Sequence, residues 1–285
     1  MSTRRNLLCL VVFLLGVGFA TASGANGSAS KIISIGGSVT EIVYALGQDH
    51  RLMARDTTSS HPPEANALPD VGYMRRLSPE GVLAFAPDLI LAEEGSGPPE
   101  AVDILRKALV PFVEIPEEFS REGVVAKIVA VGAALGVEDR AAALAAEVDG
   151  ALREAEARAA ASVREPKRVL FILSTQGGRI LASGRDTGAD AIIRMAGGVN
   201  AVSEFDGYKP MSDEAVSVAA PDVILMMDRG DHSAANKDLF AMPAIATTPA
   251  AETEAVVRMN GLFLLGFGPR TAGAVTALTE ALYTD

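Results

Sequence analysis

Short runs of apolar residues recur along the chain between longer segments of mixed polarity. Four of them occupy residues 31–35, 89–92, 168–173 and 223–226, and the second and fourth are too short and too apolar for surface helices. Runs of this length without alternating polar residues are typical of strands buried on both faces of a parallel sheet. The pattern therefore predicts central strands of parallel sheets in both halves of the chain.

Helix start and stop signals fill the segments between these runs. Ser38 and Glu41 have the spacing of a capping box, which predicts a helix that runs to Leu46 and ends before Gly47. In the second half, a helix is predicted from Thr187 to Ala196, where two glycines follow.

An internal repeat relates the two halves. Residues 72–91 and 207–225 both read Gly-Tyr, a loop, a serine, a glutamate, a short helix, Ala-Pro-Asp and an apolar strand. Ser78 and Ser212 are predicted helix N-caps, and the proline ends each helix. Each half therefore reads strand, helix, strand, helix, strand. The predicted fold class is α/β, with two Rossmann-like lobes built on parallel sheets.

The segment between the repeats, residues 120–165, is rich in Ala, Val, Glu and Arg and contains no proline before its end. Gly136 and Val137 divide it into two helices, and the second, over 138–163, is about 39 Å long at ~1.5 Å per residue. We expect it to form a stiff spine. The predicted division is an N-terminal lobe (31–119), a spine helix (120–165) and a C-terminal lobe (166–285).

The first 22 residues have the pattern of a signal peptide. Arg4 and Arg5 precede an apolar run over 7–19, and Ala20-Thr-Ala22 offers a small-residue cleavage site. The run is shorter than the ~20 residues of a membrane-spanning helix, which disfavours an uncleaved anchor. We expect export to the periplasm with cleavage near Ala22.

Composition excludes several functional classes. The 285 residues carry a formal net charge of −11, the opposite of a free-standing nucleic-acid binder. Cys9 is the sole cysteine, so a disulfide scaffold or a multi-cysteine zinc site is ruled out. The Gly36-Gly37 turn lacks both nucleotide-binding glycine patterns, and no His-Glu-x-x-His or Gly-x-Ser-x-Gly is present. We therefore predict no enzymatic activity.

Five segments carry a resemblance to a known family. They are residues 33–47 (ISIGGSVTEIVYALG), 56–64 (DTTSSHPPE), 71–78 (VGYMRRLS), 227–230 (MDRG) and 266–270 (GFGPR). With the two lobes and the long helix, they resemble the periplasmic haem-binding proteins of bacterial haem-uptake ABC transporters. These belong to the long-helix class, class III, of periplasmic substrate-binding proteins. The resemblance implies haem as a transported ligand, bound in the cleft between the lobes.

The resemblance also implies roles for individual residues. Tyr73 is expected to be the axial ligand of the haem iron, with Arg229 stabilising its phenolate from the other lobe. Tyr208, the repeat partner of Tyr73, is expected in the wall of the cleft rather than on the iron. Met74 is expected as an apolar contact to the porphyrin. His61, where many relatives have tyrosine, is a fallback iron ligand.

Basic residues beside the two repeat tyrosines, Arg75, Arg76 and Lys209, are candidates to pair with the haem propionates. The implied partners are the ABC permease, its ATPase and an outer-membrane haem receptor system. Glu100 matches the docking acid of the N-terminal lobe, and Asp231 and Asp238 are candidates for the C-terminal lobe. His50 and His232 are expected to have no ligand role.

Two other functions remain open at this point. One is a siderophore- or cobalamin-binding protein of the same class, which needs no tyrosine ligand. The other is an exported metal-dependent enzyme, for which three scattered histidines offer no evident cluster of ligands.

Overall fold

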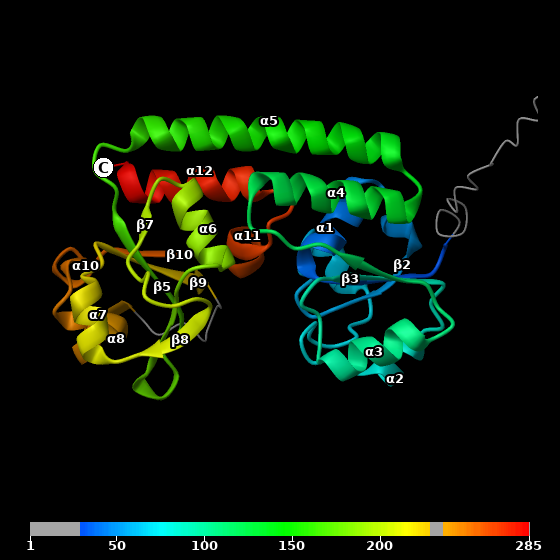
Figure 1. Cartoon of the computed structure of the whole chain (residues 1–285), viewed down its shortest axis with the longest axis horizontal. Helices are drawn as coiled ribbons and strands as arrows, with labels where there is room; N and C mark the ends of the chain where they lie inside the picture. Colours follow the sequence, from blue (N-terminus) through cyan, green and yellow to red (C-terminus); the bar gives the residue numbers. More distant parts are fainter. Residues whose placement is uncertain (1–28, 229–235, 285) are drawn as a thin grey trace, which may run out of the picture.

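The apolar runs predicted as strands form the centres of two β-sheets, one in each half of the chain. The computed structural model describes residues 29–228 and 236–284 (Figure 1). The two lobes lie side by side beneath a long helix, with the N-terminal lobe on the right in Figure 1. No helix in the described residues is long and apolar enough to cross a membrane.

The N-terminal lobe contains a four-stranded parallel sheet in the order β2-β1-β3-β4. Its strands are β1 (Ile32–Ile35), β2 (Leu52–Arg55), β3 (Leu89–Glu93) and β4 (Phe112–Ile115). Its helices are α1 (Gly37–Ala45), α2 (Pro79–Leu83), α3 (Pro99–Lys107) and two short 3₁₀ turns, η1 (Asp49–Arg51) and η2 (Pro63–Ala67).

The C-terminal lobe contains a larger, mixed sheet in the order β10-β9-β5-β6-β8, with β7 also paired to β5. Its strands are β5 (Arg168–Ser174), β6 (Ile180–Ser183), β7 (Val199–Asn200), β8 (Tyr208–Met211), β9 (Val223–Asp228) and β10 (Val256–Asn260). The helices are η3 (Gln176–Gly178), α6 (Gly188–Met195), α7 (Asp213–Ala219), α8 (Asn236–Phe240), α9 (Pro243–Ala246), α10 (Pro249–Glu252), α11 (Gly261–Leu265) and α12 (Thr271–Tyr283).

The mixed sheet corrects one sequence-based expectation. Residues after Gly207 were expected as a loop, as in the first repeat, but they form β8, which pairs antiparallel with β6. Proline lacks a backbone donor and is tolerated on such an edge strand, which accommodates Pro210. Strands β6 and β8 therefore extend a parallel core of β10, β9, β5 and β7.

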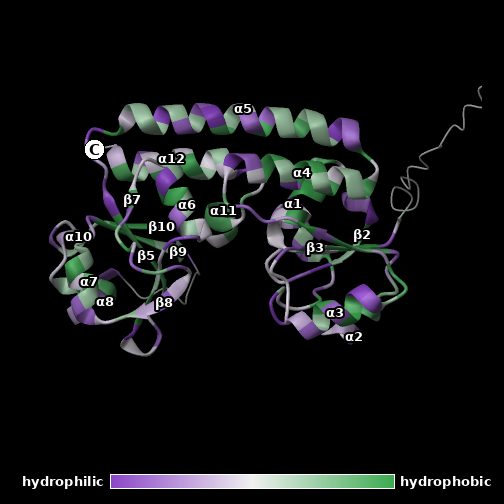
Figure 2. Ribbon diagram, in the orientation of Figure 1, coloured by the Kyte–Doolittle hydropathy of each residue, from purple (hydrophilic) through white to green (hydrophobic). Residues whose placement is uncertain are grey.

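Two helices link the lobes, as the Gly136–Val137 break predicts. Helix α4 (Arg121–Leu135) ends at Gly136, whose positive φ of 69° is typical of a helix C-cap. Helix α5 (Glu138–Ser162) then runs back across both lobes, above α4 and α12 (Figure 1). Figure 2 shows hydrophobic and hydrophilic residues alternating along α5, as expected for a helix with one face on the core and one in water.

The largest hydrophobic cluster runs through both lobes beneath these helices. It joins α1 residues such as Ile42, α4 residues such as Ile128, α5 residues such as Leu152 and C-terminal-lobe residues such as Phe171. Two smaller clusters lie on the other faces of the two sheets. The lobes therefore share one core on the side of the spine.

The internal repeat is present in three dimensions. Ser78 accepts a hydrogen bond from the backbone N–H of Gly81, and Ser212 accepts the equivalent one from Ala215, so both predicted N-caps are confirmed. The repeat aspartates also match. Asp88 accepts a backbone hydrogen bond from Lys31, and Asp222 accepts one from Arg168, each at the start of its lobe's first strand.

The capping box predicted at Ser38 and Glu41 is wrong. Gly36 occupies the N-cap position of α1, and no side chain caps this helix. Ser38 instead donates a hydrogen bond to Glu93, and Glu41 accepts one from Arg270 of the C-terminal lobe. Both side chains are committed to tertiary contacts, which local spacing does not reveal.

The Gly36-Gly37 turn is explained by close packing between the lobes. A Cβ atom on Gly37 would lie 2.5 Å from Leu262 Cδ1 of α11 and 2.8 Å from the carbonyl oxygen of Thr58. Gly36 adopts a φ of 110°, and its Cβ would lie 2.6 Å from that of Glu93. Glycine is required at both positions for the start of α1 to approach its neighbours.

Candidate ligand-binding site

Tyr73 lies in a loop between the sheet edge at Asp70 and the N-cap of α2. Its side chain is 43% exposed, whereas those of its neighbours Val71, Met74 and Leu77 are buried in the core of the N-terminal lobe. The loop is thus anchored on both sides of a tyrosine that points outward. Met74, a predicted ligand contact, is 7% exposed and packs in the core of the N-terminal lobe.

Tyr208 is the first residue of β8 and pairs with Ser183 of β6. It is half-buried, and its ring meets that of Phe171 edge-on with centroids 6.3 Å apart. Burial raises the pKa of the Tyr208 phenol. Hydrogen bonding to Thr187 and Ser183 and the positive charge of Arg75 lower this pKa without cancelling the rise. A buried phenol with a raised pKa remains protonated, which suits a wall position better than metal ligation.

Arg75 connects the two tyrosine segments across the lobes. It follows Tyr73 in the N-terminal lobe, yet its positive charge acts on the phenol of Tyr208 in the C-terminal lobe. The Tyr73 loop and β8 therefore lie on facing sides of the two lobes.

Three basic side chains near the two tyrosines lack acidic partners. Arg75, Arg76 and Lys209 are exposed, and none forms an ion pair with any residue in the described part of the chain. Lys209 lies over the ring of Phe205, with 5.3 Å from its Nζ to the ring centroid. Many other arginines are paired with carboxylates, for example Arg55 with Asp70. The three unpaired cations are therefore available to an anionic ligand.

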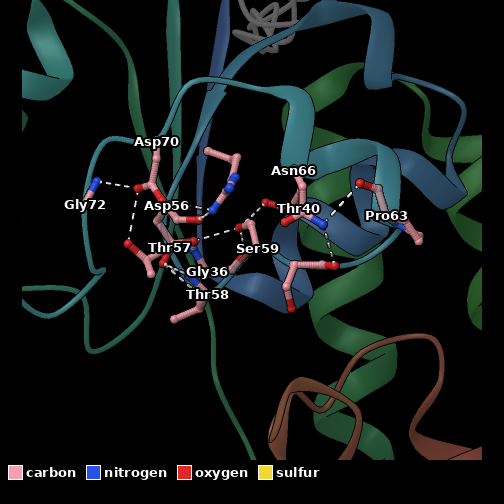
Figure 3. Close-up of polar contacts among 12 residues, drawn as sticks. Gly36, Thr40, Asp56, Thr57, Thr58, Ser59, Pro63, Asn66, Asp70 and Gly72 are labelled. Atoms are coloured by element: carbon pink, nitrogen blue, oxygen red, sulfur yellow. Dashed lines mark hydrogen bonds and ion pairs between the residues drawn. The ribbon is translucent and has the colours of Figure 1, made fainter. Parts of the chain in front are cut away.

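A hydrogen-bonded loop beside this site was not predicted from the sequence (Figure 3). Asp56, fully buried after β2, accepts hydrogen bonds from the backbone N–H of Gly36 at 3.0 Å and from the hydroxyl of Ser59 at 2.7 Å. The Ser59 hydroxyl is linked to that of Thr40, and that in turn to Ser34. The loop before His61 is thereby fixed to β1 and α1.

A second unpredicted cluster lies where the lobes meet the spine. Lys127 of α4 is fully buried, and its ammonium donates hydrogen bonds to Ser38 Oγ (3.0 Å), to Glu117 and to the carbonyl oxygen of Gly266 (3.3 Å). Glu93 lies 3.8 Å away. Burial raises the pKa of Glu117 to about 8; the charge of Lys127 opposes this shift, and that of Glu93 adds to it. The Lys127 ammonium therefore lies between two acidic side chains, Glu93 and Glu117, and contacts both lobes.

A family model described as periplasmic binding protein matches residues 32–261. This chain belongs to the periplasmic binding protein family. Among solved structures, the periplasmic haem-binding protein BhuT, in complex with two haems, is 42% identical, with a TM-score of 0.84, and the match covers 89% of this chain and 97% of BhuT. The predicted resemblance to periplasmic haem-binding proteins and the predicted class III fold are therefore confirmed.

Two curated relatives extend the comparison. YvrC of Bacillus subtilis strain 168, an uncharacterised ABC transporter substrate-binding lipoprotein, is 27% identical, and the match covers 90% of this chain and 80% of YvrC. A vitamin B12-binding protein of Pectobacterium atrosepticum is 26% identical, over 93% of this chain and 92% of its own. These relatives are binding and transport proteins rather than enzymes.

Other predicted positions of this periplasmic binding protein are distributed around the lobes. His61 is half-buried at the end of the Asp56 loop, and His50 is exposed. Glu100 is exposed in the first turn of α3, and Asp238 is exposed in α8. Arg229, Asp231 and His232 lie outside the described residues. Among the described residues, no group of three His, Cys, Asp or Glu side chains has the geometry to hold a metal ion.

Proposed function

We propose that this periplasmic binding protein binds haem between its two lobes and delivers it to an ABC permease. The observation that carries the proposal is the exposed ring of Tyr73 on a loop anchored by buried neighbours. A phenolate oxygen is a hard donor that suits Fe(III), and tyrosine is an established axial ligand of haem. The 42% identity to BhuT, which binds haem, supports the same ligand here.

Ionisation of Tyr73 is the chemical requirement of this proposal. A free phenol ionises near pH 10, so coordination at neutral pH needs positive charge beside the oxygen. The ferric ion itself supplies the largest part. Arg229, which follows β9, is proposed as a second cation that stabilises the phenolate from the C-terminal lobe. His61 is the proposed fallback ligand.

The unpaired cations support an anionic ligand. Haem carries two propionates, and we propose that Arg75, Arg76 and Lys209 pair with them. An exposed arginine without a carboxylate partner already has its donors free for a bidentate contact. The half-buried Tyr208, whose ring packs edge-on against Phe171 of its own lobe, then forms part of the wall against the porphyrin.

Cobalamin is the second candidate ligand, because a vitamin B12-binding protein matches 93% of this chain. Cobalamin needs no tyrosine ligand from the protein. An exposed Tyr73 with unpaired arginines beside it therefore favours haem.

Haemin titration followed by visible spectroscopy tests the proposal. Wild type is expected to give a high-spin ferric tyrosinate spectrum, and Tyr73→Phe, which removes only the hydroxyl, is expected to lose it. Tyr208→Phe is the matched control and retains the spectrum. No spectrum from wild type, or an identical one from Tyr73→Phe, contradicts the proposal. Binding of cyanocobalamin but not of haemin would identify cobalamin as the ligand.

Export and delivery complete the proposed function. Membership of the periplasmic binding protein family supports an exported protein, and residues 1–22 are proposed as its cleaved signal peptide. The similarity to an ABC transporter substrate-binding lipoprotein supports a permease with its ATPase as partners. Glu100 is the proposed docking acid of the N-terminal lobe, and an outer-membrane receptor system is the proposed source of haem.

A further inference from the structure

The backbone of Gly72, directly before Tyr73, is held from both sides. Asp70 Oδ1 accepts a hydrogen bond of 2.7 Å from the Gly72 N–H (Figure 3). The Thr57 N–H donates one of 3.0 Å to the Gly72 carbonyl oxygen. Gly72 adopts a φ of 97°, although a Cβ there would meet no atom within 4 Å. Glycine is therefore required by the backbone angle, and that angle is fixed by Asp70 and Thr57.

Asp70 is itself held in place by β2 and the loop that follows. Its Oδ2 accepts a hydrogen bond of 3.0 Å from Arg55 Nη1, and its Oδ1 also accepts one of 3.2 Å from the Thr57 hydroxyl. The backbones of Arg55 and its neighbours add two further hydrogen bonds, from the Arg55 N–H to Pro69 O and from the Val71 N–H to Arg55 O. The Arg55 side chain is only 11% exposed, so this ion pair has a fixed geometry.

The main chain on the far side of Tyr73 is equally constrained. The Arg76 N–H donates to the Tyr73 carbonyl oxygen at 2.7 Å, and the Gly97 N–H donates to that of Met74 at 2.8 Å. With Met74 buried beneath the loop, the backbone around Tyr73 is held on both sides while the Tyr73 ring is exposed.

We propose that Asp70 and Arg55 are positioning residues that fix the backbone from which the Tyr73 ring projects before the ligand arrives. This inference rests on the proposed function, in which Tyr73 coordinates the haem iron. A ligand side chain on a pre-ordered backbone loses less conformational entropy on binding.

The test compares haemin binding of Asp70→Ala, Asp70→Asn and the control Asp103→Ala. Asp103 is an exposed aspartate of α3 in the same lobe that also faces an arginine, Arg106, at 4.0 Å. Freeing one backbone residue corresponds to about a ten-fold loss of affinity. Asp70→Ala is expected to lose about this much and to shift the phenolate-to-iron charge-transfer band. Asp103→Ala is expected to match wild type.

Asp70→Asn retains an oxygen acceptor for the Gly72 N–H but loses the ion pair with Arg55, and we expect it to restore part of the affinity and to shift the band less than Asp70→Ala does. Wild-type affinity and band in Asp70→Ala would overturn the inference while leaving Tyr73 as the ligand. An equal loss in Asp70→Ala and Asp70→Asn would assign the effect to charge and would also overturn it. The proposed function is tested separately: a visible spectrum of Tyr73→Phe with haemin that is identical to that of wild type would contradict Tyr73 as the iron ligand.

Discussion

The guanidinium of Arg270 donates a hydrogen bond of 2.8 Å to the carboxylate of Glu41, and this contact joins the C-terminal lobe to helix α1 of the N-terminal lobe. Glu41 is buried, and Arg270 also lies over the ring of Phe263, 5.3 Å from its centroid. Together with Lys127, which reaches Gly266 of the C-terminal lobe, it forms a polar junction between lobes that share a core. We expect this junction to keep lobe movements small.

Removing the Arg270 charge should destabilise the protein. In Arg270→Met, Glu41 stays buried without its partner, and we expect a loss of about 2 kcal/mol in the free energy of unfolding. This is below the roughly 3–5 kcal/mol typical of a fully buried pair, because Arg270 is partly exposed. Urea unfolding measures the change.

Two further variants decide whether the ion pair causes that loss. The double variant Glu41→Leu/Arg270→Met removes both charges and should recover most of the stability. Arg106→Met breaks an exposed pair with Glu114, and its cost should be below about 1 kcal/mol. A double variant no more stable than Arg270→Met would contradict this interpretation.

The cluster around Lys127 predicts a pH dependence of stability. Burial raises the pKa of Glu117 from its ordinary 4.5 to about 8, so the folded protein holds a proton that the unfolded chain releases between these values. The contribution of Glu117 to the free energy of unfolding is therefore greatest at or below pH 4.5 and declines as the pH rises toward 8. Glu117→Gln should flatten that decline in urea midpoints measured from pH 5 to 8. An exposed control, Glu114→Gln, should leave it unchanged, and an unchanged slope in Glu117→Gln would refute the assignment.

The sequence correctly predicted helix caps and breaks whose interacting residues lie close together in the chain. The serine N-caps at Ser78 and Ser212 form because their bonding partners lie three residues away. The break at Gly136 is visible because glycine is the residue that tolerates the left-handed C-cap conformation. The Gly-Tyr loop, residues 72–76, could be singled out because the internal repeat and the resemblance to the haem-binding family are both carried by consecutive residues.

Contacts between distant segments could not be predicted in this way. Ser38 and Glu41 have capping-box spacing, yet their partners lie 55 and 229 residues away. Lys127 is a lone lysine in an apolar helix, and its spacing does not distinguish a buried ammonium from one that reaches the surface. Tyr208 shares the Gly-Tyr sequence of Tyr73 but begins a strand, because its neighbours pair with β6, an element that the first repeat lacks.

If the cations near the two tyrosines pair with the propionates, replacing one of them should weaken binding of haemin more than binding of haemin dimethyl ester. Arg75→Gln, Arg76→Gln and Lys209→Gln should each weaken haemin binding by about two- to five-fold, the range expected for partly solvated ion pairs. Haemin dimethyl ester has no carboxylates, so the same variants should bind it as wild type does. Arg106→Gln, distant in sequence from both tyrosines, serves as the control. Equal losses for haemin and its ester would contradict propionate pairing.

If Glu100 docks the protein on its permease, replacing Glu100 should impair delivery of haem without changing haem binding. Glu100 is exposed in the first turn of α3, and no residue in the described part of the chain forms an ion pair with it. Glu100→Ala should therefore bind haemin with wild-type affinity but fail to support growth on haem as the sole iron source in a strain that lacks the native gene. Asp103→Ala, on the same helix, should support growth normally. Full growth with Glu100→Ala would show that delivery does not depend on this acid.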